Sequence, residues 1–293
     1  MSQGKGMGTA SPTRRGPLLI RQMSGPEEVG RALDWAAAEG WNPGLHDAEC
    51  FYAADPDGFF VGLLHGEPIG CCFAVVYDDS YAFFGGYIVR PEFRGQGYGM
   101  QMTRARLTYI GHRNVGLDGV VPMQEKYARI GFRIAHRNVR YEGTAAGEHA
   151  EGVAPLRQIP FDELVAYDTV HFSAPRIGFL RRWIDQPGGA ALGAVHKGRL
   201  AGYGVVRPCR SGYKIGPLFA DSDELAEALF QSLCARVAGS PVVLDTPEIN
   251  RAAVALAERH GMKPVFETAR MYLKGRPDFP RQHVYGITSF ELG

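Results

Sequence analysis

Residues 94–99 read RGQGYG, three glycines and an arginine between an apolar, strand-like run and a helix-like stretch. In that position the backbone amides can converge on an anion, because glycine permits close approach of a ligand and positive φ values. The start of a helix adds roughly half a positive charge. The segment is therefore a candidate pyrophosphate cradle, and a plain tight turn is the alternative that the spacing leaves open.

Two other phosphate-binding loops do not fit this segment. A dinucleotide fingerprint needs glycine at its first, third and sixth positions, but Met100 follows Gly99, and Arg90 and Pro91 separate the loop from the strand. A Walker loop ends in Gly-Lys-Ser/Thr, which is absent here. Nucleotide hydrolysis and hydride transfer are therefore not supported.

Apolar runs and turn residues predict the elements that hold the loop. Strands are expected at 58–64, 69–77 and 81–89, the first two joined by a turn that begins at His65. Helical spacing is found at 27–39, and a further helix is expected from Met100 to about Ile110.

A second copy of this layout follows along the chain. Segments 60–70 and 191–202 are both strand, turn and strand, and Gly131 and Gly261 lie 130 residues apart in similar segments. We therefore expect an α/β protein of two like domains. The predicted parts are a disordered tail (1–16), a first domain (17–143), a linker (144–155) and a second domain (156–293) that ends in a strand-like stretch at 284–292.

Residues 87–99 (YIVRPEFRGQGYG) resemble motif A of the GCN5-related N-acetyltransferases (GNAT), whose pattern is met at Arg94, Gly97 and Gly99. Residues 127–132 (YARIGF) resemble the Tyr-Glu-Lys-Leu-Gly-Phe segment of that family. The two motifs have the family's order and separation and together cover about residues 69–141. The resemblance implies two GNAT-like domains, each a mixed, mostly antiparallel twisted sheet flanked by helices.

The resemblance also implies acetyl-CoA as co-substrate, its pyrophosphate on the loop and its pantetheine arm along the preceding strand. No metal is expected, because the nine histidines form no HxH or HExxH pair and the five cysteines no CxxC pair. The residues expected to bind acetyl-CoA are Ile88, Val89, Arg94, Gly95, Gln96, Gly97, Tyr98 and Gly99.

Acyl transfer from a thioester to an amine needs an oxyanion donor, an acid for the thiolate and a base for the amine. By resemblance, the amide near Val89 would receive the carbonyl oxygen and Tyr127 would protonate the sulfur; the alternative for Tyr127 is a half-buried packing tyrosine. Asp118 is the candidate base, or else part of an Asp-Gly turn. Trp41 and Asp47 could bind a cationic amine, or lie in a solvated loop.

The second copy departs from the pattern where the chemistry would need it. Residues 220–224 (ADSDE) are acidic and lack glycine, which would repel a pyrophosphate, and Ala257 aligns with Tyr127. We therefore expect only the first domain to bind acyl-CoA.

The predicted function is acetyl transfer from acetyl-CoA to a primary amine of a small molecule, by direct attack in a ternary complex. Longer acyl groups remain open, and the alternatives are a protein-lysine acetyltransferase and a CoA-binding sensor. Lys and Arg (32) balance Asp and Glu (31), so neither nucleic acid nor a membrane is an expected partner. A cytoplasmic location is expected, and the chain could be a monomer or a homodimer.

Overall fold

Two hairpin turns reveal the repeated design. His65 and Gly66 have φ values of 53° and 82°, and Lys197 and Gly198 repeat them at 52° and 76°. Two consecutive positive φ values form the tight turn that matches the twist of a hairpin. In the computed structural model, which describes residues 16–293, these turns join the second strand to the third and the eighth to the ninth.

The two halves follow the same order of elements. The first half contains β1 (Leu18–Gln22), α1 (Pro26–Ala38), α2 (Asp47–Tyr52), β2 (Phe59–Leu64), β3 (Glu67–Val76), β4 (Tyr81–Val89), α3 (Tyr98–Ile110), β5 (Asn114–Val120), α4 (Gln124–Ile130) and β6 (Arg133–Thr144). The second contains β7 (Val153–Pro155), α5 (Phe161–Phe172), α6 (Ile177–Trp183), β8 (Ala190–His196), β9 (Arg199–Pro208), β10 (Tyr213–Ala220), α7 (Asp223–Ala235), β11 (Pro241–Pro247), α8 (Arg251–Arg259), β12 (Lys263–Tyr272) and β13 (Val284–Gly286).

The ends of the predicted parts differ from the expectations in detail. Residues 1–15 of the predicted disordered tail lie outside the described residues. Strand β7 falls within 144–155 and pairs with β8. The expected strand at 284–292 was wrong beyond Gly286, because residues 287–293 leave the sheet. None of the helices within 16–293 is long and apolar enough to cross a membrane.

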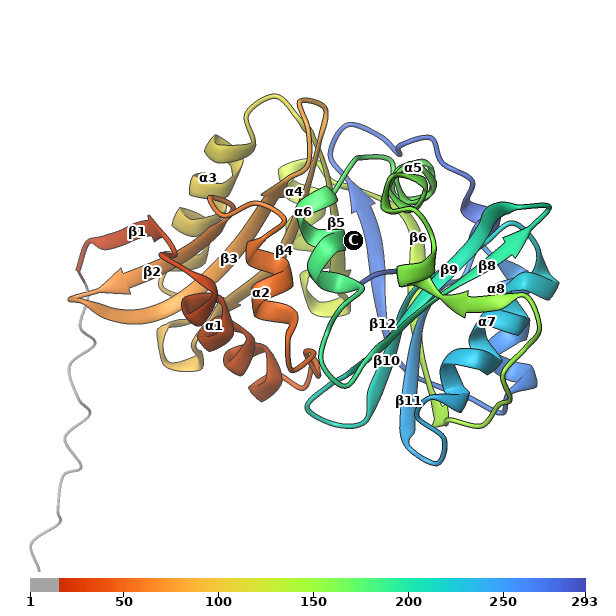
Figure 1. The fold of residues 1–293 in the computed structure, drawn as a ribbon. Helices are drawn as coiled ribbons and strands as arrows, with labels where there is room; N and C mark the ends of the chain where they lie inside the picture. The colour runs from red at the N-terminus through yellow and green to blue at the C-terminus, as the bar shows by residue number, and fades with distance from the viewer. Residues whose placement is uncertain (1–15) are drawn as a thin grey trace, which may run out of the picture.

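A single sheet runs through both halves, in the order β1-β2-β3-β4-β5-β12-β6-β11-β10-β9-β8-β7 (Figure 1). The closing strands of the two halves are exchanged. Strand β12 of the second half lies between β5 and β6, and β6 of the first half lies beside β11. The two halves therefore share backbone hydrogen bonds at the centre of the sheet.

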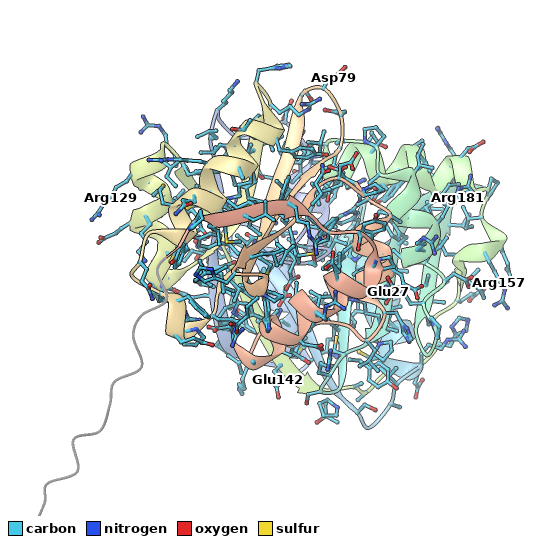
Figure 2. All side chains as sticks on the ribbon, turned by 90° about the vertical axis from the view of Figure 1, so that its left-hand side faces the viewer. Glu27, Asp79, Arg129, Glu142, Arg157 and Arg181 are labelled. Atoms are coloured by element: carbon cyan, nitrogen blue, oxygen red, sulfur yellow. The ribbon has the colours of Figure 1, made fainter. Side chains whose placement is uncertain are left out.

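Buried ion pairs connect the exchanged strands. Arg270 on β12 lies opposite Asp118 on β5, and Arg140 on β6 lies opposite Asp245 on β11. The two arginines lie 130 residues apart, like Gly131 and Gly261. The repeat thus places one buried ion pair at each point where a strand is exchanged. By contrast, the charged side chains labelled in Figure 2, such as those at its upper edge and left side, are exposed.

Strands β4 and β5 separate along their length. They pair only from Tyr81 with Asn114 to Phe84 with Leu117, although β4 continues to Val89 and β5 to Val120. In the second half, β10 and β11 also pair only at their start, but β13 pairs with the end of β10. The gap between diverging strands is thus filled by the chain itself in the second half.

Candidate active site

The glycine loop lies at the wide end of the gap between β4 and β5. Gly95 and Gly97 have φ values of 74° and 85°, and a Cβ atom at either position would meet no atom within 4 Å. Gly97 is the N-cap of α3 and has no side chain to occupy the first amides of the helix. These observations fit an anion held over the start of α3.

A third glycine of the loop is required by packing. A Cβ atom on Gly99 would lie 2.1 Å from the hydroxyl oxygen of Tyr87. Burial raises the pKa of Tyr87 above its ordinary value, so its hydroxyl stays protonated. The hydroxyl of Tyr87 therefore lies against the first turn of α3.

A channel leads from the loop along β4. Seven of the eight residues predicted to bind the co-substrate border it; Gln96 does not, and its amide donates to the carbonyl of Glu92. Arg94 donates through Nε to the carbonyl of Val89 at 2.7 Å and forms an ion pair with Glu39. The bordering residues are Ile88, Val89, Arg94, Gly95, Gly97, Tyr98 and Gly99.

A second hollow, here called the central cavity, continues from this channel. Trp41, Tyr87, Val120 and Met123 border both the channel and the cavity. The remaining walls of the cavity come from both halves of the chain, from β4, β5, α3, α4, β6, β12 and residues 290–291. A ligand in the channel and a ligand in the cavity would therefore meet at these four residues.

Tyr127, the predicted acid, and Trp41, predicted to bind the amine, both border the central cavity. Tyr127 is 8% exposed, and its ring packs edge-on against Phe132 at 6.1 Å. Its hydroxyl forms no hydrogen bond with another described residue.

Comparisons with known proteins agree with this geometry. A family described as "Acetyltransferase (GNAT) family" matches residues 27–132, and one described as "Acetyltransferase (GNAT) domain" matches residues 164–286. Over 263 residues the chain is 30% identical to a protein named Holothin acyltransferase from Pseudoalteromonas sp. (strain SANK 73390), covering 89% of this chain and 90% of that protein. The chain belongs to the GNAT acetyltransferase family.

Solved structures extend the likeness in fold to nearly the whole chain. A crystal structure from Pyrococcus horikoshii has a TM-score of 0.79 and 22% identity and covers 100% of both chains. A tandem GNAT protein from the clavulanic acid biosynthesis pathway has a TM-score of 0.62 and 15% identity, covering 89% of this chain and 100% of that one. The chain is thus an acyltransferase with two GNAT domains, and GNAT enzymes use acetyl-CoA.

Asp118 borders the central cavity of this GNAT protein, but its oxygens already have partners. It accepts from Arg270 at 2.9 Å and 2.7 Å and from Asn138 at 2.8 Å, and its side chain is fully buried. Burial raises the pKa of Asp118, while Arg270 acts in the opposite direction. The expected Asp-Gly turn is wrong, because Asp118 and Gly119 lie within β5.

Asp47 does not reach the central cavity. It accepts from Arg207 at 2.8 Å and 3.2 Å and from the amide of Gly44, and it is 1% exposed. The prediction that Asp47 binds the amine, and the alternative of a solvated loop, are therefore both contradicted. Asp47 joins α2 to β9 of the second half.

Thiol chemistry is not favoured by the cysteines. All five are buried and free. Burial raises the pKa of Cys72 to about 11 and that of Cys50 to about 12. The nucleophilic thiolate is therefore strongly disfavoured at these positions.

Three charged residues of the central cavity were not found from the sequence: Arg106, Glu291 and Arg140, which is paired with Asp245. Arg106 lies on α3 among residues that look like an ordinary helix surface, and Glu291 lies in the stretch after β13. Arg104 and Arg106 stand two positions apart, yet the first is exposed and the second is 1% exposed. Arg106 lies one helical turn beyond Met102, a residue of α3 that faces the core, and this spacing is the one signal that separates the two arginines.

Proposed function

We propose that this GNAT protein transfers the acetyl group of acetyl-CoA to a primary amine of a small molecule, by direct attack in a ternary complex. The observation that carries the proposal is the junction of the channel with the central cavity at Trp41, Tyr87, Val120 and Met123. A thioester whose pyrophosphate rests on the loop would present its carbonyl carbon to a molecule held in the cavity.

In the proposed reaction, the lone pair of the neutral amine attacks the thioester carbonyl carbon and forms a C–N bond. The C–S bond then breaks, and its electron pair leaves with the sulfur. Tyr127 donates its proton to that sulfur and regains one from solvent, while the amine nitrogen gives up one proton to a base. The products are an amide and the free thiol of CoA.

Glu291 is our choice for the base. It borders the central cavity, is 4% exposed, and forms no ion pair or side-chain hydrogen bond within the described chain. Asp118 borders the same cavity, but Arg270 and Asn138 occupy its oxygens. A carboxylate without a partner can accept the proton or hold the ammonium form of the acceptor.

The walls of the cavity favour a small acceptor over a lysine on a protein. Trp41 comes from the first half, while Phe266 and Phe290 come from the second. The ring centres of Phe266 and Phe290 are only 5.8 Å apart. These aromatic side chains narrow the space that the peptide on either side of a lysine would have to occupy.

The test is thiol release with acetyl-CoA and a panel of small amines beside lysine-containing peptides. We expect turnover on a small amine, with intersecting two-substrate kinetics, and a loss of about 100-fold in kcat for Glu291→Gln. Glu125→Gln, at an exposed position on α4, is the matched control. Turnover on peptides alone would favour a protein acetyltransferase, and binding of acetyl-CoA without turnover on either would favour a sensor.

A further inference from the structure

Arg106 is a buried guanidinium without an anionic partner in the described chain. It is 1% exposed and borders the central cavity. Its guanidinium forms no ion pair or hydrogen bond with residues 16–293, and its Nε atom is fully enclosed. An unpaired buried charge is costly, so this side chain is expected to have a partner that the chain does not supply.

The other buried arginines show what such a side chain normally binds. Five arginines are buried among the described residues, and only Arg106 lacks an aspartate. The other four each donate two hydrogen bonds to one aspartate: Arg140 to Asp245, Arg176 to Asp168, Arg207 to Asp47, and Arg270 to Asp118.

Aromatic rings hold the guanidinium of Arg106 in place. Its central carbon lies 4.2 Å from the ring centre of Phe84, 4.7 Å from that of Tyr87 and 5.9 Å from that of Tyr127. Rings contact the faces of a guanidinium and leave its N–H edges available. The side chain of Arg106 is thus held in place with its N–H donors unpaired, beside Tyr127, the proposed acid.

We propose that Arg106 binds a carboxylate carried by one of the two substrates. This rests on the proposed function, since the site lies in the cavity where acyl group and amine meet. The backbone of Arg106 is nine residues beyond Gly97, about 13 Å along α3, and the side chain borders the central cavity but not the channel that holds the glycine loop, so a group in the cavity is favoured over the pyrophosphate as its partner. A planar carboxylate matches the paired donors of a guanidinium.

The carboxylate has two chemical sources. An amino acid would carry it on the acceptor, with its amine toward Glu291 on the same cavity. A dicarboxylic acyl thioester would carry it at the far end of the acyl chain. Thr268 adds a second polar atom without a partner, its Oγ1, to the wall of this cavity.

The experiment compares substrates that differ only in the charged group. On the acceptor side, glycine is compared with glycinamide at saturating acetyl-CoA. On the acyl side, succinyl-CoA is compared with butyryl-CoA, by turnover and by calorimetric binding. We expect a preference for the carboxylate member of one pair, and a loss of about 10- to 150-fold of that preference in Arg106→Met.

Matched variants separate this role from a structural one. Arg104→Met removes an exposed arginine from the same helix and should keep the preference. Arg106→Lys should restore part of it and leave acetyl-CoA affinity unchanged. Equal use of both members of each pair by the wild type, or a preference that survives in Arg106→Met, would overturn the proposal. Failure of the proposed function would give a different result from failure of the Arg106 proposal, because acetyl-CoA would then bind without turnover of any amine. The binding of succinyl-CoA to the wild type and to Arg106→Met would still test the role of Arg106.

A second cluster carries an independent inference in the other half. His171 on α5, Asp221 after β10 and His283 in the short helix Arg281–His283 each offer one ligand atom, and all three atoms lie within 4.8 Å of one another. Asp221 Oδ1 is 4.0 Å from His171 Nε2 and 3.8 Å from His283 Nδ1. The acidic segment that replaces the glycine loop thus contributes to this cluster.

The supporting contacts fit a metal ligand. Nδ1 of His171 lies 2.8 Å from the carbonyl of Tyr167, which leaves the lone pair of Nε2 toward the cluster, where it is buried without a partner. The hydroxyl of Tyr167 donates to Asp221 at 2.8 Å. Such secondary hydrogen bonds orient the ligands of metal sites.

We infer that His171, Asp221 and His283 bind a divalent transition metal such as zinc. Ligand bonds of about 2.0–2.1 Å would place the ligand atoms about 3.4 Å apart, so each of the three atoms would have to move toward the ion by less than about 1 Å. The ion would connect the short helix Arg281–His283 to α5 and to the end of β10.

Calorimetry and thermal melting with Zn²⁺ test this inference. We expect zinc to bind and raise the melting temperature of the wild type, and both effects to be lost in His283→Ala. His196→Ala, at an exposed position, should keep them. A melting temperature that zinc leaves unchanged, or a shift that survives in His283→Ala, would overturn the inference.

Discussion

Tyr127 is the residue on which the proposed chemistry depends most. Its ring packs against Phe132, the residue borders the central cavity, and its hydroxyl has no hydrogen-bond partner in the described chain. We predict that Tyr127→Phe lowers kcat by about 100-fold, because the thiolate would leave without a proton donor. The KM for acetyl-CoA should change little. Steady-state thiol release measures both quantities.

The control for this prediction is Tyr52→Phe, which removes a hydroxyl on α2 that forms no hydrogen bond within residues 16–293. It should leave kcat unchanged. A Tyr127→Phe protein with wild-type kcat would mean that solvent or another group protonates the sulfur.

At the scale of the elements, the exchange of β6 and β12 depends on buried ion pairs. Replacing Asp118 with Asn leaves Arg270 charged and buried with weaker partners. We predict a loss of about 3–5 kcal/mol in the free energy of unfolding, measured with denaturant. Asp245→Asn should act in the same way through Arg140.

The double variant Asp118→Leu with Arg270→Met is the control, because apolar replacement of both partners removes the unpaired charge. It should recover most of the lost stability. A folded Asp118→Asn protein with unimpaired stability and a kcat more than about 100-fold lower would instead make Asp118 the base.

Local patterns in the sequence were sufficient for the hairpins, the glycine turn before α3 and α3 itself, since residues within a few positions determine a turn or the start of a helix. The exchange could not be predicted, because Asp118 and Arg270 are opposite each other only through pairing across 152 residues. The same separation explains why the pairing of Asp118, the predicted base, with Arg270 could not be foreseen. Glu291 reaches the cavity through a segment without a recognisable pattern.

At the scale of the whole molecule, neither half has a complete sheet by itself. A chain of residues 16–143 would lack β12 beside β5 and β11 beside β6. We predict that this fragment does not melt cooperatively, and that co-expression with residues 144–293 restores a folded complex. Circular dichroism melting of each preparation checks the prediction, and a cooperative transition of the isolated fragment would contradict it.

The stability of the molecule should also depend on pH through His136. Burial, followed by the positive charges of Arg270, Arg276 and Arg281, lowers the pKa of His136 to about 3. Below about pH 6.5 the unfolded chain therefore binds a proton at His136 that the folded chain does not bind. The free energy of unfolding is thus highest above pH 6.5 and decreases as the pH falls toward 3.

We predict that from pH 7 to pH 5 the wild type loses about 2 kcal/mol more of its free energy of unfolding than His136→Leu does. Denaturant titrations at both pH values measure this difference. Parallel losses in the two proteins would show that His136 is protonated in the folded state.

We propose that only the first of the two GNAT domains binds acetyl-CoA. In the second half, β13 pairs along β10 where the strands diverge, and the side chain of Ser222 accepts from the amide of Leu225 at the start of α7. Both features favour a single site, at the loop of the first half.

Calorimetric titration with acetyl-CoA counts the sites on each chain. We predict one equivalent bound per chain, and no binding by Gly97→Asp, which places a carboxylate over the start of α3 at a φ of 85°. Gly97→Asn, which tolerates that φ and adds no charge, should keep part of the affinity. Two equivalents per chain, or full affinity in Gly97→Asp, would contradict the account.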